Sequence, residues 1–301
     1  MMKNKLIPFF WGALSLAYLA TPTFADVIAD MPGRATGCKV LNLNDAETSA
    51  LWSGSCVDEK ISGAGVLVIN FIETKASCTQ TGEFKEGLRH GFAKSNCTDG
   101  SSLEGMFTNG ILTSKGIRIG PDGDRWEGEY KDGLLNGQGT HTFAKLPKYD
   151  YRGMFKDNKY NGQGEQTFPN GEKRVGEFKD GDFSKGVVTY PNKTKYEGDF
   201  KKDEPHGKGK LTYELGTTYE GDFEHGMYHG QGRLIYLNGD HQIGLFRAGR
   251  FVGGNAKFSG SLKPNQEDPQ KAHQKAQAEF NQQKRNNIID QWNRSRAWEG
   301  I

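Results

Sequence analysis

Two stretches of the sequence repeat one pattern: YEGDFKKDEPHGKGKLTY at residues 196–213 and YEGDFEHGMYHGQGRLIY at residues 219–236. In the first of them, Tyr196, Gly198 and Phe200 follow one another at steps of two residues. Side chains two residues apart on a β-strand point to the same face. The pattern therefore predicts a strand that carries both aromatic rings on one face, with a glycine between them.

The same pattern recurs along most of the chain. A glycine stands two residues before an aromatic residue at Gly82, Gly105, Gly128, Gly153, Gly176, Gly198, Gly221 and Gly244. Gly54 extends the series, with Cys56 in the aromatic position, and successive glycines lie between 22 and 28 residues apart. Spacing this regular over nine units indicates a tandem array.

Each unit also carries the residues of two turns. Five residues after the leading glycine stands a residue type that tolerates positive φ, namely Gly87, Gly110, Gly133, Asn158, Gly181, Asp203, Gly226 or Gly249, and only Glu59 in the first unit departs from this rule. A GxG pair is then expected to open a second strand, as at Gly137/Gly139 and Gly207/Gly209. A second turn follows, as at Asn238-Gly239, and such dipeptides are strong hairpin signals. Each unit is thus predicted to be a short antiparallel hairpin with a turn at either end.

These signals predict an all-β fold. An isolated hairpin is at best marginally stable in water, so the hairpins are expected to stack into one elongated, twisted sheet with a narrow core. The composition agrees, because 41 glycines and 11% aromatic residues accompany only 35% hydrophobic residues. That apolar share is low for one large core, and the aromatic share is high for a disordered chain.

The repeated unit is similar to the MORN repeat, whose pattern runs YEGxFxxGxxxGxGxxxY. RWEGEYKDGLLNGQGTHTF at residues 125–143 and the two stretches quoted above carry this resemblance, which covers about residues 50–258. The units led by Gly176 and Gly244 lack a regular GxG pair, and the three units before Trp126 are degenerate. The residues that define the repeat are Trp126, Gly128, Tyr130, Tyr151, Gly153, Phe155, Tyr196, Gly198, Phe200, Tyr219, Gly221 and Phe223.

The resemblance implies a binding role and no catalysis. MORN arrays form hairpin rods that act in protein–protein contacts, scaffolding and dimerisation, and some are linked to phospholipid binding. We therefore expect a non-enzymatic scaffold for an unidentified protein, with a homodimer as one possibility. The alternative is a peripheral protein that binds phospholipid or an envelope polymer. The segments outside the repeats, about 26–50 and 259–301, are too short for an ordinary catalytic domain, and no cofactor is expected.

The first residues resemble a secretory signal of a bacterial type. Lys3 and Lys5 precede an apolar run over residues 6–20, and Thr23-Phe24-Ala25 predicts cleavage between Ala25 and Asp26. A retained membrane anchor is the alternative, although the run is short for a spanning helix. Removing two lysines from 39 basic residues leaves 37, equal to the 37 acidic residues, and this balance gives no support for nucleic-acid binding. We expect a periplasmic or secreted protein.

The four cysteines, Cys38, Cys56, Cys78 and Cys97, lie in the first third of the chain. In an oxidising compartment an even number predicts disulfides, with three possible connectivities. The pairs Cys38–Cys56 and Cys78–Cys97 are favoured because both gaps are of hairpin size. A zinc site is the weaker reading, since no pair has CxxC spacing.

The last segment differs in composition from the repeats. Ala272, Ala276, Phe280, Ile288 and Trp292 are separated by multiples of four residues, which predicts a short C-terminal helix that caps the rod or docks on a partner. The predicted organisation is a signal peptide at 1–25, a disulfide-bearing region at 26–124, the repeat array at 125–258, and a linker with a helix at 259–301. His90, His206 and His229 occupy a slot that holds asparagine in other units, so turn formation is favoured over metal binding.

Overall fold

The computed structural model describes residues 27–30, 38–40, 48–71, 75–145 and 149–258. Every regular element within these ranges is a β-strand, and none of the described residues forms a helix long and apolar enough to cross a membrane. The predicted signal peptide and C-terminal helix lie outside the described residues.

Five strands form the N-terminal end: β1 (Val27–Asp30), β2 (Cys38–Val40), β3 (Thr48–Trp52), β4 (Ser55–Val57) and β5 (Lys60–Phe71). Sixteen more follow: β6 (Ser77–Lys85), β7 (Leu88–Cys97), β8 (Ser102–Thr108), β9 (Ile111–Ile119), β10 (Arg125–Lys131), β11 (Leu134–Thr142), β12 (Asp150–Lys156), β13 (Lys159–Thr167), β14 (Lys173–Lys179), β15 (Asp182–Thr189), β16 (Lys195–Lys201), β17 (Glu204–Thr212), β18 (Thr218–Glu224), β19 (Met227–Ile235), β20 (His241–Arg247) and β21 (Arg250–Lys257).

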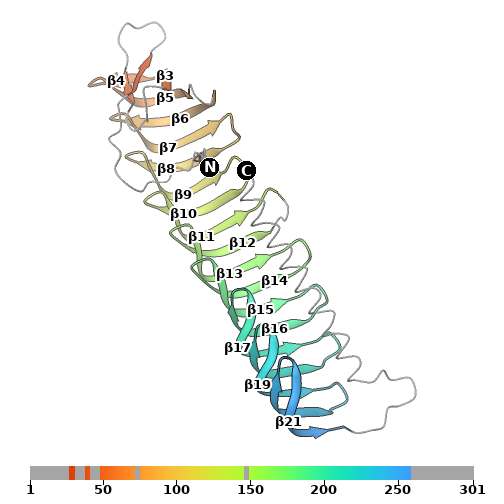
Figure 1. Cartoon of the computed structure of the whole chain (residues 1–301). Coiled ribbons are helices and arrows are strands. Elements are labelled where there is room, and N and C mark those ends of the chain that lie inside the picture. Colours follow the sequence, from red (N-terminus) through yellow and green to blue (C-terminus); the bar gives the residue numbers. More distant parts are fainter. Residues whose placement is uncertain (1–26, 31–37, 41–47, 72–74, 146–148, 259–301) are drawn as a thin grey trace, which may run out of the picture.

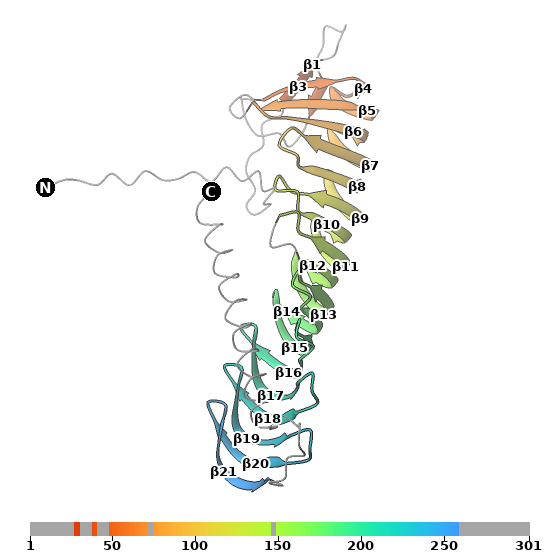
Figure 2. The same ribbon diagram turned by 90° about the vertical axis from the view of Figure 1, so that its right-hand side faces the viewer.

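All strands belong to one sheet that forms a long rod (Figure 1). From β5 to β21 each strand pairs antiparallel with the next one in the sequence. Strands β3 and β4 pair with the other edge of β5, and β1 and β2 join them. Figure 2 shows how the sheet twists along the rod, so that the last hairpins are rotated relative to the first. The predicted all-β fold of tandem hairpins is confirmed.

A row of glycines crosses the sheet at one level. Every strand from β10 to β21 contributes one glycine to this row, and each glycine pairs with the glycine of the next strand. The row therefore contains both the leading glycine of each unit and the second glycine of each GxG pair. It also explains the two irregular units, whose Gly186 and Gly254 keep their places in it. On the N-terminal side Ala93 replaces a glycine, between Gly82 and Gly105.

Aromatic rings on one face of the sheet, here named the core face, make glycine necessary in this row. Tyr219 is fully buried, and its hydroxyl donates a hydrogen bond to the Asp222 carbonyl at 3.0 Å. Its ring reaches over Gly221 and Gly232, where an added Cβ would collide with the hydroxyl. Tyr151 and Tyr196 bond to the carbonyls three residues ahead of them in the same way, at 2.9 and 3.0 Å.

The rings of neighbouring hairpins pack edge to face along the rod. The Tyr219 ring stacks on Tyr228 at 3.7 Å between centroids and meets the edges of Phe223 and Phe246 at 5.1 and 5.0 Å. One buried cluster built in this way runs from Ala93 to Phe246, and a second one around Trp52 fills the N-terminal end. Because each ring contacts the hairpin before or after it, stability is shared along the array.

Both residues of every two-residue turn have positive φ, which is the type I′ geometry that suits a twisted hairpin. This includes Glu59, the one departure from the sequence rule, whose φ is 61°. The turns also stack: the Gly226 amide donates to the Pro205 carbonyl of the preceding hairpin at 2.9 Å.

The GxG pairs do not open the second strands, contrary to expectation. Strand β19 begins at Met227, directly after the turn, and Gly230 lies three residues into it with φ 56°. There the pairing shifts between Gly221 and Asp222, so that the extra residues form a bulge. The Asp222 carboxylate accepts a hydrogen bond from the Gln231 amide at 3.0 Å, which explains the acidic residue of the GDF and GEF motifs.

Replacing Ala248 by asparagine is expected to raise the free energy of unfolding by about 0.5–1 kcal/mol. Ala248 has φ 48° in the turn before β21, a conformation that alanine disfavours and asparagine tolerates. Ala248→Val should instead lower the free energy of unfolding, since a β-branched residue is disfavoured even more than alanine at positive φ. Thermal unfolding of the three proteins checks this, and equal melting of the Asn and Val variants would contradict it.

Both favoured disulfide pairings are present at the N-terminal end. Cys78 and Cys97 face each other across β6 and β7, with their Cα atoms 4.0 Å apart. Cys38 on β2 joins Cys56 on β4, with a Cα–Cα distance of 5.8 Å. The two bonds thus tie down the end of the rod where the repeats are least regular.

Candidate functional site: a groove across the core face

The aromatic core is interrupted in β10–β14. One row of paired residues on the core face runs through Trp126, His141, Tyr151, Gln166, Arg174, Val188, Tyr196, Leu211, Tyr219 and Leu234. From Val188 to Leu234 the row is wholly apolar or aromatic, and Gln242 on β20 follows. His141, Gln166 and Arg174 are polar yet less than a tenth exposed, so this segment holds three buried hydrogen-bonding side chains in positions that are apolar or aromatic from Val188 to Leu234.

His141 lies at the centre of the interruption. Its Nδ1 is 2.7 Å from the Tyr160 hydroxyl, and its ring stacks on Trp126 at 4.5 Å and tilts against Phe143 at 3.9 Å. Burial lowers the pKa of His141 to about 4, so the imidazole is neutral at physiological pH. A neutral ring has one donor and one acceptor nitrogen, so Nδ1 accepts from the Tyr160 hydroxyl in the tautomer that carries its proton at Nε2.

Asp124 approaches His141 from the loop before β10. The turn Pro121-Asp122-Gly123 places it there: Asp122 Oδ1 accepts the Asp124 amide at 3.1 Å, and Gly123 has φ 90°. Asp124 Oδ1 accepts the Ala144 amide at 2.9 Å, while Oδ2 lies 3.6 Å from His141 Nε2. Desolvation raises the pKa of this carboxyl above its ordinary value.

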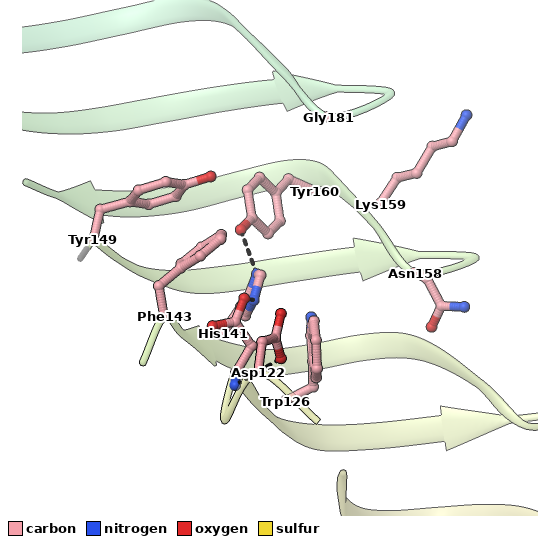
Figure 3. A pocket seen from close by; sticks show the side chains of 10 residues that line it. Asp122, Trp126, His141, Phe143, Tyr149, Asn158, Lys159, Tyr160 and Gly181 are labelled. Atoms are coloured by element: carbon pink, nitrogen blue, oxygen red, sulfur yellow. Dashed lines mark hydrogen bonds and ion pairs between the residues drawn. The ribbon is translucent and has the colours of Figure 1, made fainter. Parts of the chain in front are cut away.

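These residues border a groove of about 400 Å³ (Figure 3), a volume in the range of small-ligand sites. It is lined by Asp122, Asp124, Trp126, His141, Phe143, Tyr149, Asn158, Lys159, Tyr160 and Gly181. The aromatic rings Phe143 and Tyr149 pack together at 4.0 Å on the loop side, and Lys159 and Asn158 lie at the turn side. The groove therefore has an acidic end at the loops and a basic residue at the turns.

The groove combines apolar and polar groups. Its walls supply aromatic surface, a neutral histidine, tyrosine hydroxyls and two carboxylates. Among the described residues no group of three or more His, Cys, Asp or Glu side chains is placed to hold a metal ion.

A second polar arrangement lies one hairpin further along the same face. The Arg174 guanidinium donates from Nε to Glu172 at 2.8 Å and from an Nη atom to Asp203 at 2.6 Å. The same guanidinium lies over the Phe168 ring at 4.8 Å. Glu172 is only 2% exposed, so here a buried carboxylate has a cation as its partner.

The residues that define the repeat fall into two places in the structure. Their glycines lie in the glycine row, and their aromatic rings lie on the core face, where all but the partly buried Trp126 and Phe200 are buried. Of this set, only Trp126 borders the groove. Asn158 and Gly181 were named from the sequence only as turn residues, and the other groove residues were not linked to a site.

Two signals in the sequence could have pointed to the groove. The interval between Gly128 and Gly153 is 25 residues, longer than any later interval. His141 also stands in the slot that holds leucine at Leu211 and Leu234. The histidines singled out from the sequence lie elsewhere: His90, His206 and His229 stand in strands β7, β17 and β19, not in the turns that were predicted for them, and His229 Nδ1 is 3.1 Å from Glu224.

Six stretches of the chain match the MORN repeat: residues 81–102, 104–125, 126–145, 151–173, 196–218 and 219–241. They include two units before Trp126 and leave out those led by Gly176 and Gly244. No curated protein matches the sequence. Thirty-seven solved chains are similar in structure, among them the SAS-4 (dCPAP) TCP domain in complex with a proline-rich motif of Ana2 (dSTIL) of Drosophila melanogaster. That likeness has a TM-score of 0.33 at 15% identity and covers 51% of this chain and 83% of the other.

Proposed function

We propose that this chain, a β-rod containing six MORN repeats, is an exported, non-enzymatic scaffold that binds another protein through the core-face groove at β10–β13. The groove carries the proposal, because it is the place where the repeated core gives way to exposed aromatic edges and buried polar groups. A rod that served only to hold its two ends apart would not need an interruption of its aromatic core. Aromatic pockets with a few fixed polar groups are typical of recognition sites.

Export is the second element of the proposal. It is supported by the two disulfides, which persist in oxidising compartments, and by the charged and apolar pattern of the first 25 residues. Intact-mass measurement of the protein purified from its native cell envelope or medium should give a chain that begins at Asp26. A mass that includes residues 1–25 would instead support the retained anchor.

Affinity capture tests the binding role. The mature chain 26–301, immobilised and incubated with envelope extract, is expected to retain a protein partner in a saturable manner. Trp126→Ala and Tyr149→Ala should weaken this retention at least about tenfold, because truncated aromatic anchors cost most at an interface. Phe92→Ala is the matched control, since Phe92 is an aromatic residue 55% exposed on the opposite face, away from the groove.

Vesicle flotation of the same proteins tests the alternative. If the chain floats with anionic vesicles and retains no protein, the lipid-binding alternative replaces the proposed function. If Phe92→Ala abolishes partner retention and the groove variants do not, the opposite face of the sheet is the binding surface.

A further inference from the structure

We propose that the acidic end of the groove, Asp122 and Asp124, binds an arginine side chain of the partner protein. This inference rests on the proposed function, because it names the chemistry by which that same groove would recognise its partner.

The first observation is a buried carboxylate without a cation. Asp124 is 6% exposed, and among the described residues its one ion-pair contact is with His141, at 3.6 Å. That imidazole is neutral, and its buried Nε2 has no hydrogen-bond partner within the described part of the chain. Lys145 is close enough to act on Asp124 electrostatically but makes no ion pair with it. Burying an ionised carboxylate in this way is costly unless a charge partner is supplied.

The second observation is that the chain pairs one equivalent carboxylate, Glu172, with an arginine, while the other, Asp240 before β20, accepts a hydrogen bond from the Asn238 side-chain amide at 2.8 Å. The loop before β14 has the same turn as the loop before β10. Asn170 Oδ1 accepts a hydrogen bond from the Glu172 backbone amide at 2.9 Å, just as Asp122 Oδ1 accepts one from the Asp124 amide. Two residues after Glu172 stands Arg174, whose guanidinium bonds to that carboxylate and covers the Phe168 ring. Two residues after Asp124 stands Trp126 instead. Among the described residues, the β10 loop therefore receives no such cation from its own strand.

The third observation is that the groove has space and access for such a group. Asp122, Trp126, Phe143 and Tyr149 are only partly buried, so the acidic end is open to solvent next to aromatic walls. A planar guanidinium suits this combination better than an ammonium, since it bonds to a carboxylate through two N–H groups and lies against rings. Lys159 at the opposite end of the groove repels a basic residue there and so favours one orientation.

Binding of a small arginine probe to the mature chain tests the inference without knowledge of the partner. Nα-acetyl-arginine amide, titrated into the labelled protein, is expected to shift the NMR signals of the Trp126 indole and the His141 ring in a saturable manner. The citrulline analogue has nearly the same shape without the charge and should bind at least about tenfold more weakly. This comparison uses the unmodified protein, so it does not depend on whether a variant folds.

Variants then test which carboxylates bind the arginine. Asp124→Asn and Asp122→Asn should each weaken arginine binding about tenfold, whereas Asp99→Asn should leave it unchanged. Asp99 is the matched control because its carboxylate accepts the Ser101 amide at 2.8 Å in the corresponding loop before β8. Equal binding of arginine and citrulline, absence of saturable shifts, or an equal effect of Asp99→Asn would overturn the inference. A protein partner that is lost with Trp126→Ala but kept with both aspartate variants would retain the groove as the binding site and reject arginine as its ligand.

Discussion

Gly198→Val and Gly221→Val should each lower the free energy of unfolding by about 4 kcal/mol, at the upper end of what single substitutions do. An added Cβ at Gly221 would lie 2.5 Å from the Cα of Gly232 and 2.6 Å from the carbonyl oxygen of Gln231. At Gly198 the corresponding atoms are the carbonyl oxygen of Lys208, at 2.5 Å, and the Cα of Gly209, at 2.6 Å. All of these are backbone atoms of the paired strand, so no side-chain rotation relieves the overlap. The tyrosine ring above each glycine closes the remaining direction.

Gly253→Val is the matched control for these two variants. Gly253 is exposed on β21, and an added Cβ there meets no atom within 4 Å. Its unfolding free energy should stay within about 0.5 kcal/mol of the unmodified protein. Urea unfolding followed by circular dichroism measures all three. Unchanged midpoints for both Gly198→Val and Gly221→Val would show that these glycines do not pair as described.

The hairpin array could be predicted from the sequence because the same local pattern is repeated in nine units. Each unit fixes the strand period through its two aromatic residues and the turn through a residue that tolerates positive φ. The unit led by Gly176 lacks a regular GxG pair, but the spacing of the units on either side of it still identifies it as a hairpin. The pair Cys78–Cys97 followed from the same logic, since the two residues face each other across the hairpin β6–β7, whereas Cys38 and Cys56 lie on β2 and β4, which both pair with β5.

Features that depend on pairing between strands could not be predicted in this way. The GxG motif was assigned to a strand start, because a glycine pair looks like a turn when only its own neighbours are considered. In the structure its first glycine forms a bulge and its second lies in the glycine row, and both roles are set by the opposite strand. The continuous pairing of β9 with β10 likewise has no counterpart in the sequence, where the repeats change in regularity at about residue 125.

The groove was missed for a related reason. His141 receives its environment from Asp124, whose carboxylate accepts a hydrogen bond from the Ala144 amide, and from Tyr160 on another hairpin. None of these residues is unusual in its own stretch of sequence. Only the alignment of units shows that a histidine stands at a position that holds leucine elsewhere. Only the fold shows that the Asp124 carboxylate, which has no ion pair with a lysine or arginine of the described residues, lies beside it.

His141 makes the stability of the rod depend on pH. The folded state holds its pKa at about 4, against an ordinary value of 6.5, because burial disfavours the charged ring. As the pH falls below 6.5, the unfolded chain binds a proton at this residue that the folded chain does not. Stability is therefore lost progressively between pH 6.5 and about 4, and the loss levels off below pH 4. A difference of 2.5 pKa units corresponds to on the order of 3 kcal/mol over this range.

His141→Leu should remove this dependence. Leucine occupies the equivalent position at Leu211 and Leu234, so the variant is expected to fold with stability close to that of the unmodified protein at pH 7. At pH 4 it should be the more stable by about 3 kcal/mol. Asp124 acts in the opposite direction, since its raised pKa means that protonation on acidification relieves a buried charge, but it is present in both proteins. Asp122 and Tyr160, which also face the ring, are likewise unchanged, so the difference between the two proteins isolates His141. Urea unfolding at intervals from pH 7 to pH 4 measures it, and a difference that stays constant across this range would mean that His141 is not buried in its neutral form.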